Sequence, residues 1–204
     1  SPRVESSCGI TLSHKQKNLT CGSDKFLIND MHSKIMIDNA EVTLKEGHVV
    51  PLCWSENAKQ FSRLMYKERN KDGMRLYIGP KHTINANEAF YREAEPFLCW
   101  PGLIDGNSIR LGKISQNGFY NVSVYQHDYA MRLLKHVLAM DHYDVVFAYT
   151  SLLDKVQHEL LSEVGTDTQG KVKNFVEEAF AVVSEDLKSV MEVLGKKDSL
   201  LVFS

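Results

Sequence analysis

The feature that most constrains the fold of this chain is an uninterrupted apolar run at residues 145–149, Val-Val-Phe-Ala-Tyr, between two helical patterns. A continuous apolar run of this length is typical of a strand with helices covering both of its faces. Residues 126–140 before it and about 169–194 after it carry apolar side chains at the spacing of amphipathic helices. Residues 199–203 indicate a second buried strand. Strand, helices and strand in this order form a βαβ unit, so we expect two parallel strands.

The amino-terminal part has a different pattern. Short runs rich in strand-forming residues are bounded there by Asp, Asn and Gly. These runs are 25–28, 34–38, 41–44, 61–66 and 74–78. Asp38-Asn39 and Asp72-Gly73 suit tight hairpin turns. We therefore predict a small antiparallel sheet in this part of the chain.

The two patterns define a fold class and three regions. We predict an α/β chain, α+β overall, in which a small β-rich insertion domain precedes a βαβ portion of a mostly parallel sheet. The β-rich region covers residues 1–82, a loop-rich connecting segment covers 83–124, and the partial α/β core covers 125–204. A two-stranded parallel unit cannot cover its own faces, so this core should belong to a larger sheet.

Composition excludes some classes of function. The 204 residues are 43% hydrophobic and 25% charged, as in an ordinary globular chain. The formal net charge of −2 argues against a protein that binds nucleic-acid polymers, because proteins of that class usually carry a basic stripe. No apolar run approaches the roughly 20 residues that a membrane-spanning helix needs.

The compartment stays open at this stage. The four cysteines are widely spaced and do not form a zinc-ribbon pattern, although Cys8 and Cys21 could close a short loop in an oxidising compartment. The amino terminus has no signal-peptide core. Asn18-Leu-Thr20 and Asn121-Val-Ser123 are glycosylation sequons, which matter only in a secreted protein.

Asp154 and His158 follow the apolar run and are the candidate metal ligands. Their spacing of four residues would place both side chains on one face of a helix, with Cβ atoms about 6 Å apart. The pair would lie beyond the carboxyl end of the strand, where open α/β sheets hold ligands. A carboxylate and an imidazole in this arrangement can share one divalent transition metal.

Both residues also have structural explanations. Ser151-Leu-Leu-Asp154 fits a capping box, in which the acid satisfies a backbone donor at the start of the helix. A single histidine on a helix is more often solvated, or buried and satisfied by a neighbour, than bound to a metal. The spacing alone therefore leaves metal binding and a structural role open.

Residues 144–161 resemble the metal-ligand segment of the alkaline phosphatase superfamily, in its type I phosphodiesterase/nucleotide pyrophosphatase-like branch. In that branch a hydrophobic strand leads to an Asp-x-x-x-His pair. Residues 37–47 followed by 73–78 resemble the β-rich insertion that microbial members carry before this strand. Residues 199–204 resemble the strand that leads into an Asp-His-Gly metal motif in the family. The resemblance touches most of residues 34–204.

The resemblance implies an alkaline-phosphatase-like fold and a hydrolase of phosphodiester or pyrophosphate bonds, with a small phosphorylated substrate such as a nucleotide. Asp154 and His158 would be two ligands of one metal in a two-metal site. Zinc is the favoured metal, with manganese or magnesium as alternatives. The sequence has no counterpart of the family's nucleophile or of its other ligands. The chain is therefore expected to contain no catalytic residue, to be an incomplete fragment and to be inactive in isolation.

Two other functions stay open. The chain could be a non-catalytic binding or interaction module, in which Asp154 caps a helix and His158 is structural. It could also derive from a phosphomonoesterase or a mutase of the same superfamily. These enzymes share the metal pair, and their substrate specificity would depend on the nucleophile region, which has no counterpart here, and on the insertion. In each case the exposed edges of a partial sheet would favour self-association.

Overall fold

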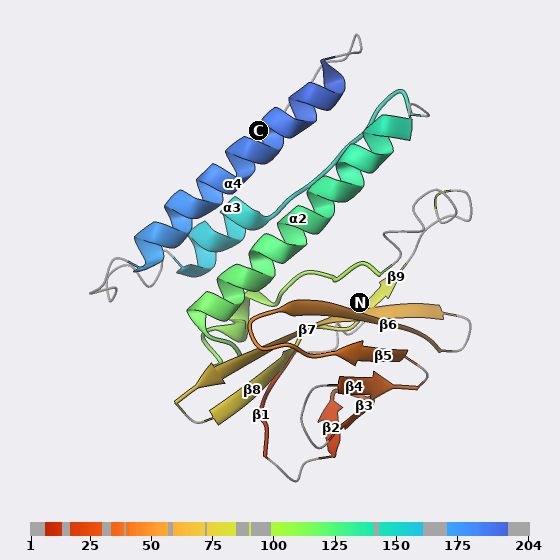
Figure 1. Ribbon diagram of the computed structural model, residues 1–204, viewed down its shortest axis with the longest axis vertical. Helices are drawn as coiled ribbons and strands as arrows, with labels where there is room; N and C mark the ends of the chain where they lie inside the picture. The colour runs from red at the N-terminus through yellow and green to blue at the C-terminus, as the bar shows by residue number, and fades with distance from the viewer. Residues whose placement is uncertain are drawn as a thin grey trace. The chain divides into compact units, whose positions relative to one another are not determined.

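The computed structural model of the chain describes residues 7–13, 17–29, 34–38, 40–56, 59–71, 73–84, 90, 99–140, 143–160 and 171–195 (Figure 1). The chain divides into two compact units, Ser1–Val122 and Ser123–Ser204. Within the described ranges, no helix combines the length and the apolar character needed to cross a membrane.

The first unit is built from two antiparallel sheets. Its strands are β1 (Cys8–Thr11), β2 (Asn18–Cys21), β3 (Asp24–Ile28), β4 (Lys34–Ile37), β5 (Ala40–Thr43), β6 (Val49–Glu56), β7 (Lys59–Asn70), β8 (Gly73–Ile78) and β9 (His82–Ile84). The larger sheet has the order β1-β8-β7-β6, with β9 paired to β7, and the smaller sheet has the order β2-β3-β4-β5. The prediction of a β-rich, antiparallel amino-terminal region is therefore confirmed.

Local sequence signals account for most of these strands. The five predicted runs coincide with β3, β4, β5, β7 and β8, and the runs 34–38 and 41–44 extend one residue beyond β4 and β5. Asp38, with a φ of 48°, lies in the turn between β4 and β5, and Gly73, with a φ of 118°, follows the turn between β7 and β8. β6 was not predicted because it contains Pro51, which cannot donate to a sheet ladder. The position of β6 at one end of the larger sheet tolerates such a residue.

Buried side chains from both sheets form one core. Alternate residues of the smaller sheet face it, as the burial of Leu19, Phe26 and Ile35 shows, because successive strand residues point to opposite faces. Leu52 and Leu76 contribute from the larger sheet. Each fully buried Leu, Ile or Phe side chain stabilises such a core by roughly 1.5–3 kcal/mol.

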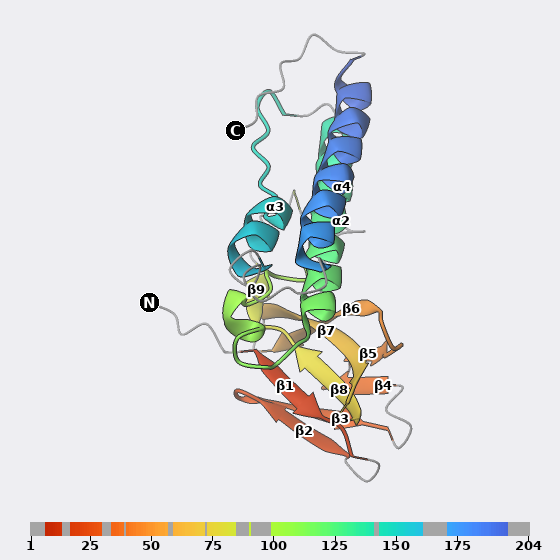
Figure 2. The ribbon, with the colours of Figure 1, turned by 90° about the vertical axis from the view of Figure 1, so that its left-hand side faces the viewer.

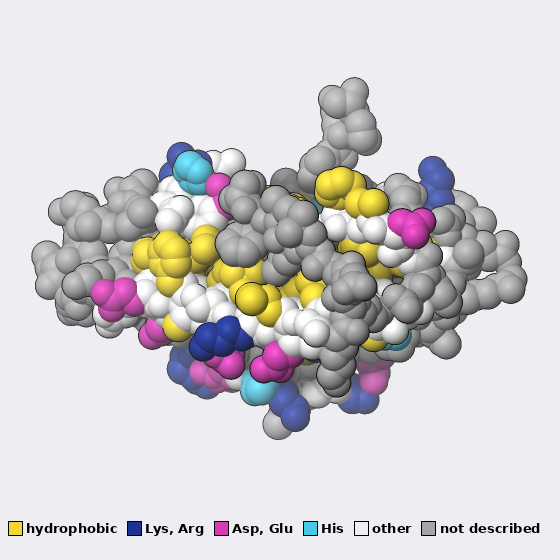
Figure 3. Space-filling view, turned by 90° about the horizontal axis from the view of Figure 1, so that it is seen from above, with side chains coloured by type: hydrophobic (Ala, Val, Ile, Leu, Met, Phe, Trp, Pro, Cys, Tyr) yellow, Lys and Arg dark blue, Asp and Glu magenta, His cyan; other side chains and the backbone are white. Residues whose placement is uncertain are grey.

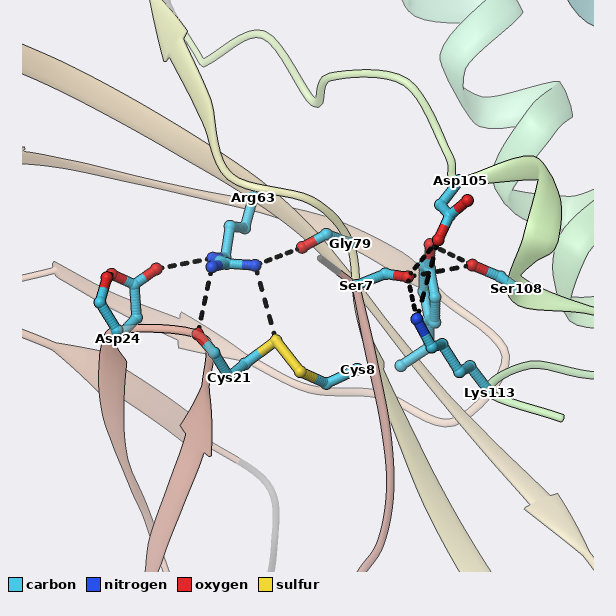
Figure 4. Close-up of a disulfide and its surroundings, with 11 residues drawn as sticks. Ser7, Cys8, Cys21, Asp24, Arg63, Gly79, Asp105, Ser108 and Lys113 are labelled. Atoms are coloured by element: carbon cyan, nitrogen blue, oxygen red, sulfur yellow. Dashed lines mark hydrogen bonds and ion pairs between the residues drawn. A yellow bond between two sulfur atoms is a disulfide. The ribbon is translucent and has the colours of Figure 1, made fainter. Parts of the chain in front are cut away.

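A buried arginine ties the two sheets together. Arg63 on β7 is 0% exposed and donates from Nε to Asp24 Oδ2 of β3 at 2.7 Å (Figure 4). Its Nη1 donates to the carbonyl of Gly79 at 2.7 Å and its Nη2 to the carbonyl of Cys21 at 3.2 Å. Asp24 also accepts from Lys81 Nζ at 2.8 Å. The guanidinium can be buried because its donors are satisfied and its charge is paired.

All four cysteines are paired in disulfides. Cys8–Cys21 links β1 of the larger sheet to β2 of the smaller one, as the sequence had suggested for an oxidising compartment (Figure 4). Cys53–Cys99 links β6 to the segment that follows the strands. The second pair was not predicted, because its partners are 46 residues apart in the sequence.

The other face of the larger sheet is covered by residues 101–122. The Ser115 hydroxyl donates to Glu68 Oε2 at 2.6 Å, and Asn121 Nδ2 donates to the Tyr66 hydroxyl at 3.1 Å. Phe119 is 0% exposed. Part of this segment is helical, since α2 (Gln116–Met140) begins inside the range that was expected to be loop-rich.

The regular secondary structure in the described part of the second unit is helical. Its elements are the rest of α2, α3 (Leu152–Lys155), the π-helical turn η3 (Val156–Leu160) and α4 (Lys171–Leu194). Both predicted long helices are confirmed, and Gly195 directly follows α4. Ala179 and Val190 of α4 are buried, whereas Phe180, which was expected on the same apolar stripe, is 47% exposed.

The predicted strand at residues 145–149 is wrong for this structure. The segment is extended but has no regular secondary structure, and it runs back beside α2 and α4 (Figures 1 and 2). A strand needs a neighbour to pair its backbone groups, and no described segment supplies one. The expected partner at residues 199–203 lies outside the described residues. The mixed α+β character is confirmed, but both described sheets are antiparallel rather than parallel.

Candidate metal site

Asp154 and His158 lie together on one helical face. Asp154 is in α3 and His158 is in the turn η3 that continues it. His158 Nε2 is 3.1 Å from Asp154 Oδ1, and the two side chains are 77% and 57% exposed, respectively. Both donor atoms are therefore open to solvent and near each other.

The distance between the two donors suits a shared metal. Zinc binds histidine nitrogen and carboxylate oxygen at about 2.0–2.2 Å in tetrahedral geometry, which places two ligand atoms roughly 3.3 Å apart. The separation of Nε2 and Oδ1, 3.1 Å, is close to this value. The pair fits two positions of a four-coordinate site with little movement of the side chains.

Asp154 and His158 lie where a regular α-helix changes to a π-helical turn. Residues Val156–Leu160 form a π-helical turn directly after α3. Such turns, with hydrogen bonds from residue i to i+5, are rare and frequently occur at functional sites. His158 lies within this turn, and Asp154 lies in α3 directly before it.

The capping-box explanation of Asp154 finds little support in the contacts. Ser151 occupies the N-cap position, but its side chain makes no capping hydrogen bond within the described part of the chain. In a capping box the Ser hydroxyl would bond the backbone of Asp154. The carboxylate of Asp154 instead contacts the imidazole of His158.

The described residues do not complete a metal site. Among them, no group of three or more His, Cys, Asp or Glu side chains is arranged to hold a metal ion. Catalytic zinc sites use three protein ligands and a water molecule. Asp154 and His158 would supply two of the three protein ligands of such a site.

A buried polar cluster that the sequence did not reveal lies next to this helix. His127 of α2 is 2% exposed, and its Nδ1 lies 2.5 Å from Thr150 Oγ1. Its Nε2 lies 3.0 Å from Asp186 Oδ2 on α4. Lys135 Nζ approaches the other carboxylate oxygen of Asp186 at 3.5 Å. These residues are far apart in the sequence and follow no motif, so no local signal could have found them.

The charge state of His127 follows from its surroundings. Burial lowers the pKa of His127 below its ordinary value of 6.5, against the opposing effect of the Asp186 carboxylate. The ring is therefore neutral at neutral pH. Because a carboxylate can only accept, Nε2 donates to Asp186, and Nδ1 accepts from the Thr150 hydroxyl. Thr150 precedes Ser151 at the N-cap of α3, so this cluster holds the start of the helix that carries Asp154 and His158.

Comparisons with protein-family models, with curated proteins and with solved structures gave no match. A functional assignment therefore depends on the residues and their geometry.

Proposed function

We propose that this chain is part of a metal-dependent hydrolase of phosphodiester or pyrophosphate bonds. The enzyme would belong to the phosphodiesterase/nucleotide pyrophosphatase-like branch of the alkaline phosphatase superfamily, with a small phosphorylated substrate such as a nucleotide. The observation that carries the proposal is the exposed Asp154–His158 pair, whose donor atoms lie at the spacing of two ligands of one metal.

Each residue has a defined role in this proposal. Asp154 supplies a negatively charged oxygen ligand and His158 a nitrogen ligand through Nε2. This mixed set favours zinc, with manganese or magnesium as alternatives. A metal bound there would polarise a phosphoryl oxygen and lower the pKa of a bound water. His127, through Thr150, would keep the ligand helix in place.

We propose further that the remaining metal ligands and the nucleophile of the enzyme lie outside the residues that the structure describes, among which only these two ligands come together. The isolated chain would then bind metal weakly and be inactive, because a stable catalytic site needs a third protein ligand.

The exposed segment at residues 145–149 supports the same proposal. Val145, Phe147 and Tyr149 are 67%, 96% and 70% exposed, whereas Val146 between them is half-buried. Ala148 is exposed as well, so four of the five apolar side chains of this segment are open to solvent. We propose that the segment becomes a strand of a mostly parallel sheet in the complete enzyme, with residues 199–203 as a neighbour.

Metal titration of the purified chain tests the ligand pair. We expect zinc to bind weakly by calorimetry, and His158→Ala or Asp154→Asn to weaken binding at least tenfold. His48→Ala is the matched control, since His48 is also exposed and lies in the first unit. Absent zinc binding, or equal binding by His158→Ala and the wild type, would contradict the proposal. Such a result would favour the non-catalytic binding module.

Hydrolysis assays test the incomplete site separately. We expect no metal-dependent cleavage of a bis-aryl phosphodiester by the isolated chain. Robust cleavage that is lost in His158→Ala would show that the chain carries a complete site. In that case, comparing a phosphodiester with a phosphomonoester substrate would separate a phosphodiesterase from a phosphomonoesterase or mutase.

A further inference from the structure

The sequon Asn18-Leu-Thr20 lies on an accessible strand. β2 is the terminal strand of the smaller sheet (Figure 1). Asn18 and Thr20 are exposed, whereas Leu19 between them is 2% exposed and belongs to the core. Since alternate residues of a strand share a face, the acceptor amide and the hydroxyl that the sequon requires point outward together.

The disulfides indicate where such a chain is made. Cys8–Cys21 and Cys53–Cys99 use every cysteine of the protein. Disulfides form and persist in oxidising environments such as the lumen of the secretory pathway and the cell surface. Asparagine-linked glycans are added on the same side of the membrane. The exposure of the sequon and the presence of two disulfides are independent observations.

We propose that Asn18 is a site of asparagine-linked glycosylation. The donor would be a lipid-pyrophosphate-linked oligosaccharide. Asn18 Nδ2 forms a bond to the anomeric carbon of the sugar, the bond from that carbon to the pyrophosphate oxygen breaks, and the lipid pyrophosphate leaves. The amide nitrogen loses one proton in the exchange, and no oxidant or reductant is needed.

The second sequon, Asn121-Val-Ser123, is not equivalent. Asn121 Nδ2 already donates to the Tyr66 hydroxyl at 3.1 Å. The Ser123 side chain is 2% exposed. A glycan on Asn121 would disrupt the contact with Tyr66, and the required hydroxyl is buried. The folded protein should therefore carry its glycan on Asn18 and leave Asn121 unmodified.

The surroundings of Asn18 give the glycan a physical role. Leu27 lies directly opposite Asn18 in the ladder between β2 and β3, and Met36 lies opposite Leu27 on β4. Cross-strand partners share a face, and Leu27 and Met36 are 58% and 36% exposed. A glycan on Asn18 would cover this apolar pair on the outer face of the sheet.

Secretion of the full chain from a eukaryotic host, behind a cleavable leader, tests the proposal. The intact mass is measured before and after treatment with peptide N-glycosidase. We expect one glycan on the wild type, its loss in Asn18→Gln and Thr20→Ala, and its retention in Thr20→Ser and Asn121→Gln. Deamidation at residue 18 after the treatment, found by peptide mass spectrometry, locates the site.

The controls separate a missing acceptor from a misfolded protein. Asn18→Gln and Thr20→Ala should keep both disulfides and the wild-type melting temperature of the deglycosylated protein, because both side chains are exposed. A wild-type chain without a glycan would overturn the proposal. So would a glycan that is lost in Asn121→Gln and kept in Asn18→Gln. If little protein is secreted, cell-free translation with microsomes gives the same readout.

Discussion

His127 Nε2 on α2 lies 3.0 Å from Asp186 Oδ2 on α4, and this contact joins the two long helices of the second unit. The same ring accepts from Thr150 just before α3. One buried imidazole thus connects three segments. The position of the candidate ligand helix depends on this connection.

Replacing His127 should destabilise the second unit. His127→Ala removes two hydrogen bonds and leaves the Thr150 hydroxyl without its partner, so we expect a loss of about 1–3 kcal/mol in the free energy of unfolding. Urea denaturation followed by helical circular dichroism measures it. The control is His158→Ala, whose side chain is 77% exposed and which should change stability by less than about 0.5 kcal/mol. Equal losses for both variants would contradict the structural role of His127.

The stability of this unit should also depend on pH. The pKa of buried His127 is below 6.5, so the unfolded chain takes up a proton at a higher pH than the folded chain does. The stability that neutral His127 contributes is therefore fully present above pH 6.5, the ordinary pKa of histidine. It is lost as the pH falls through the lower pKa of His127 in the folded state. His127→Gln cannot titrate, and its stability should fall less than that of the wild type between about pH 7.5 and about pH 5.5. Identical pH profiles would show that other groups control the effect.

Breaking the buried ion pair between Arg63 and Asp24 should destabilise the first unit. Arg63→Ala leaves Asp24 buried without its guanidinium, and we expect a loss of about 3–5 kcal/mol in thermal or denaturant unfolding. The matched control is Arg69→Ala on the same strand, whose side chain is 66% exposed in its pair with Glu46. Exposed pairs contribute about 0–1 kcal/mol. A small effect at Arg63 would mean that Lys81 alone compensates Asp24.

The exposed face of residues 145–149 should drive self-association. Phe147 is the most exposed large apolar residue of those described, at 96%. Figure 3 shows that hydrophobic side chains are exposed on one face of the molecule. We expect the chain to associate with increasing concentration, and Phe147→Lys to shift it toward the monomer in sedimentation velocity. Leu111→Lys, at a position that is 63% exposed in the first unit, should leave association unchanged. A wild type that stays monomeric would refute this prediction.

Local patterns were sufficient for part of the fold. The alternation of buried and exposed residues in β3 and the helical spacing in α4 both follow from the sequence, because a side chain's direction repeats with the local backbone geometry. The turn at Asp38 was predictable for the same reason. β1 and β2 were missed, since each is four residues long and contains only one large aliphatic side chain, Ile10 or Leu19.

The sequence by itself determined five strands of the first unit, the two long helices of the chain, and that Asp154 and His158 share a helical face. Only the tertiary structure decided which distant residues meet: Arg63 with Asp24, Cys53 with Cys99, and His127 with Asp186. It also decided that residues 145–149 pair with no strand in the described part of the chain. The reason is physical, because periodicity is a property of neighbouring residues, whereas burial, pairing and strand formation depend on partners supplied by remote parts of the chain.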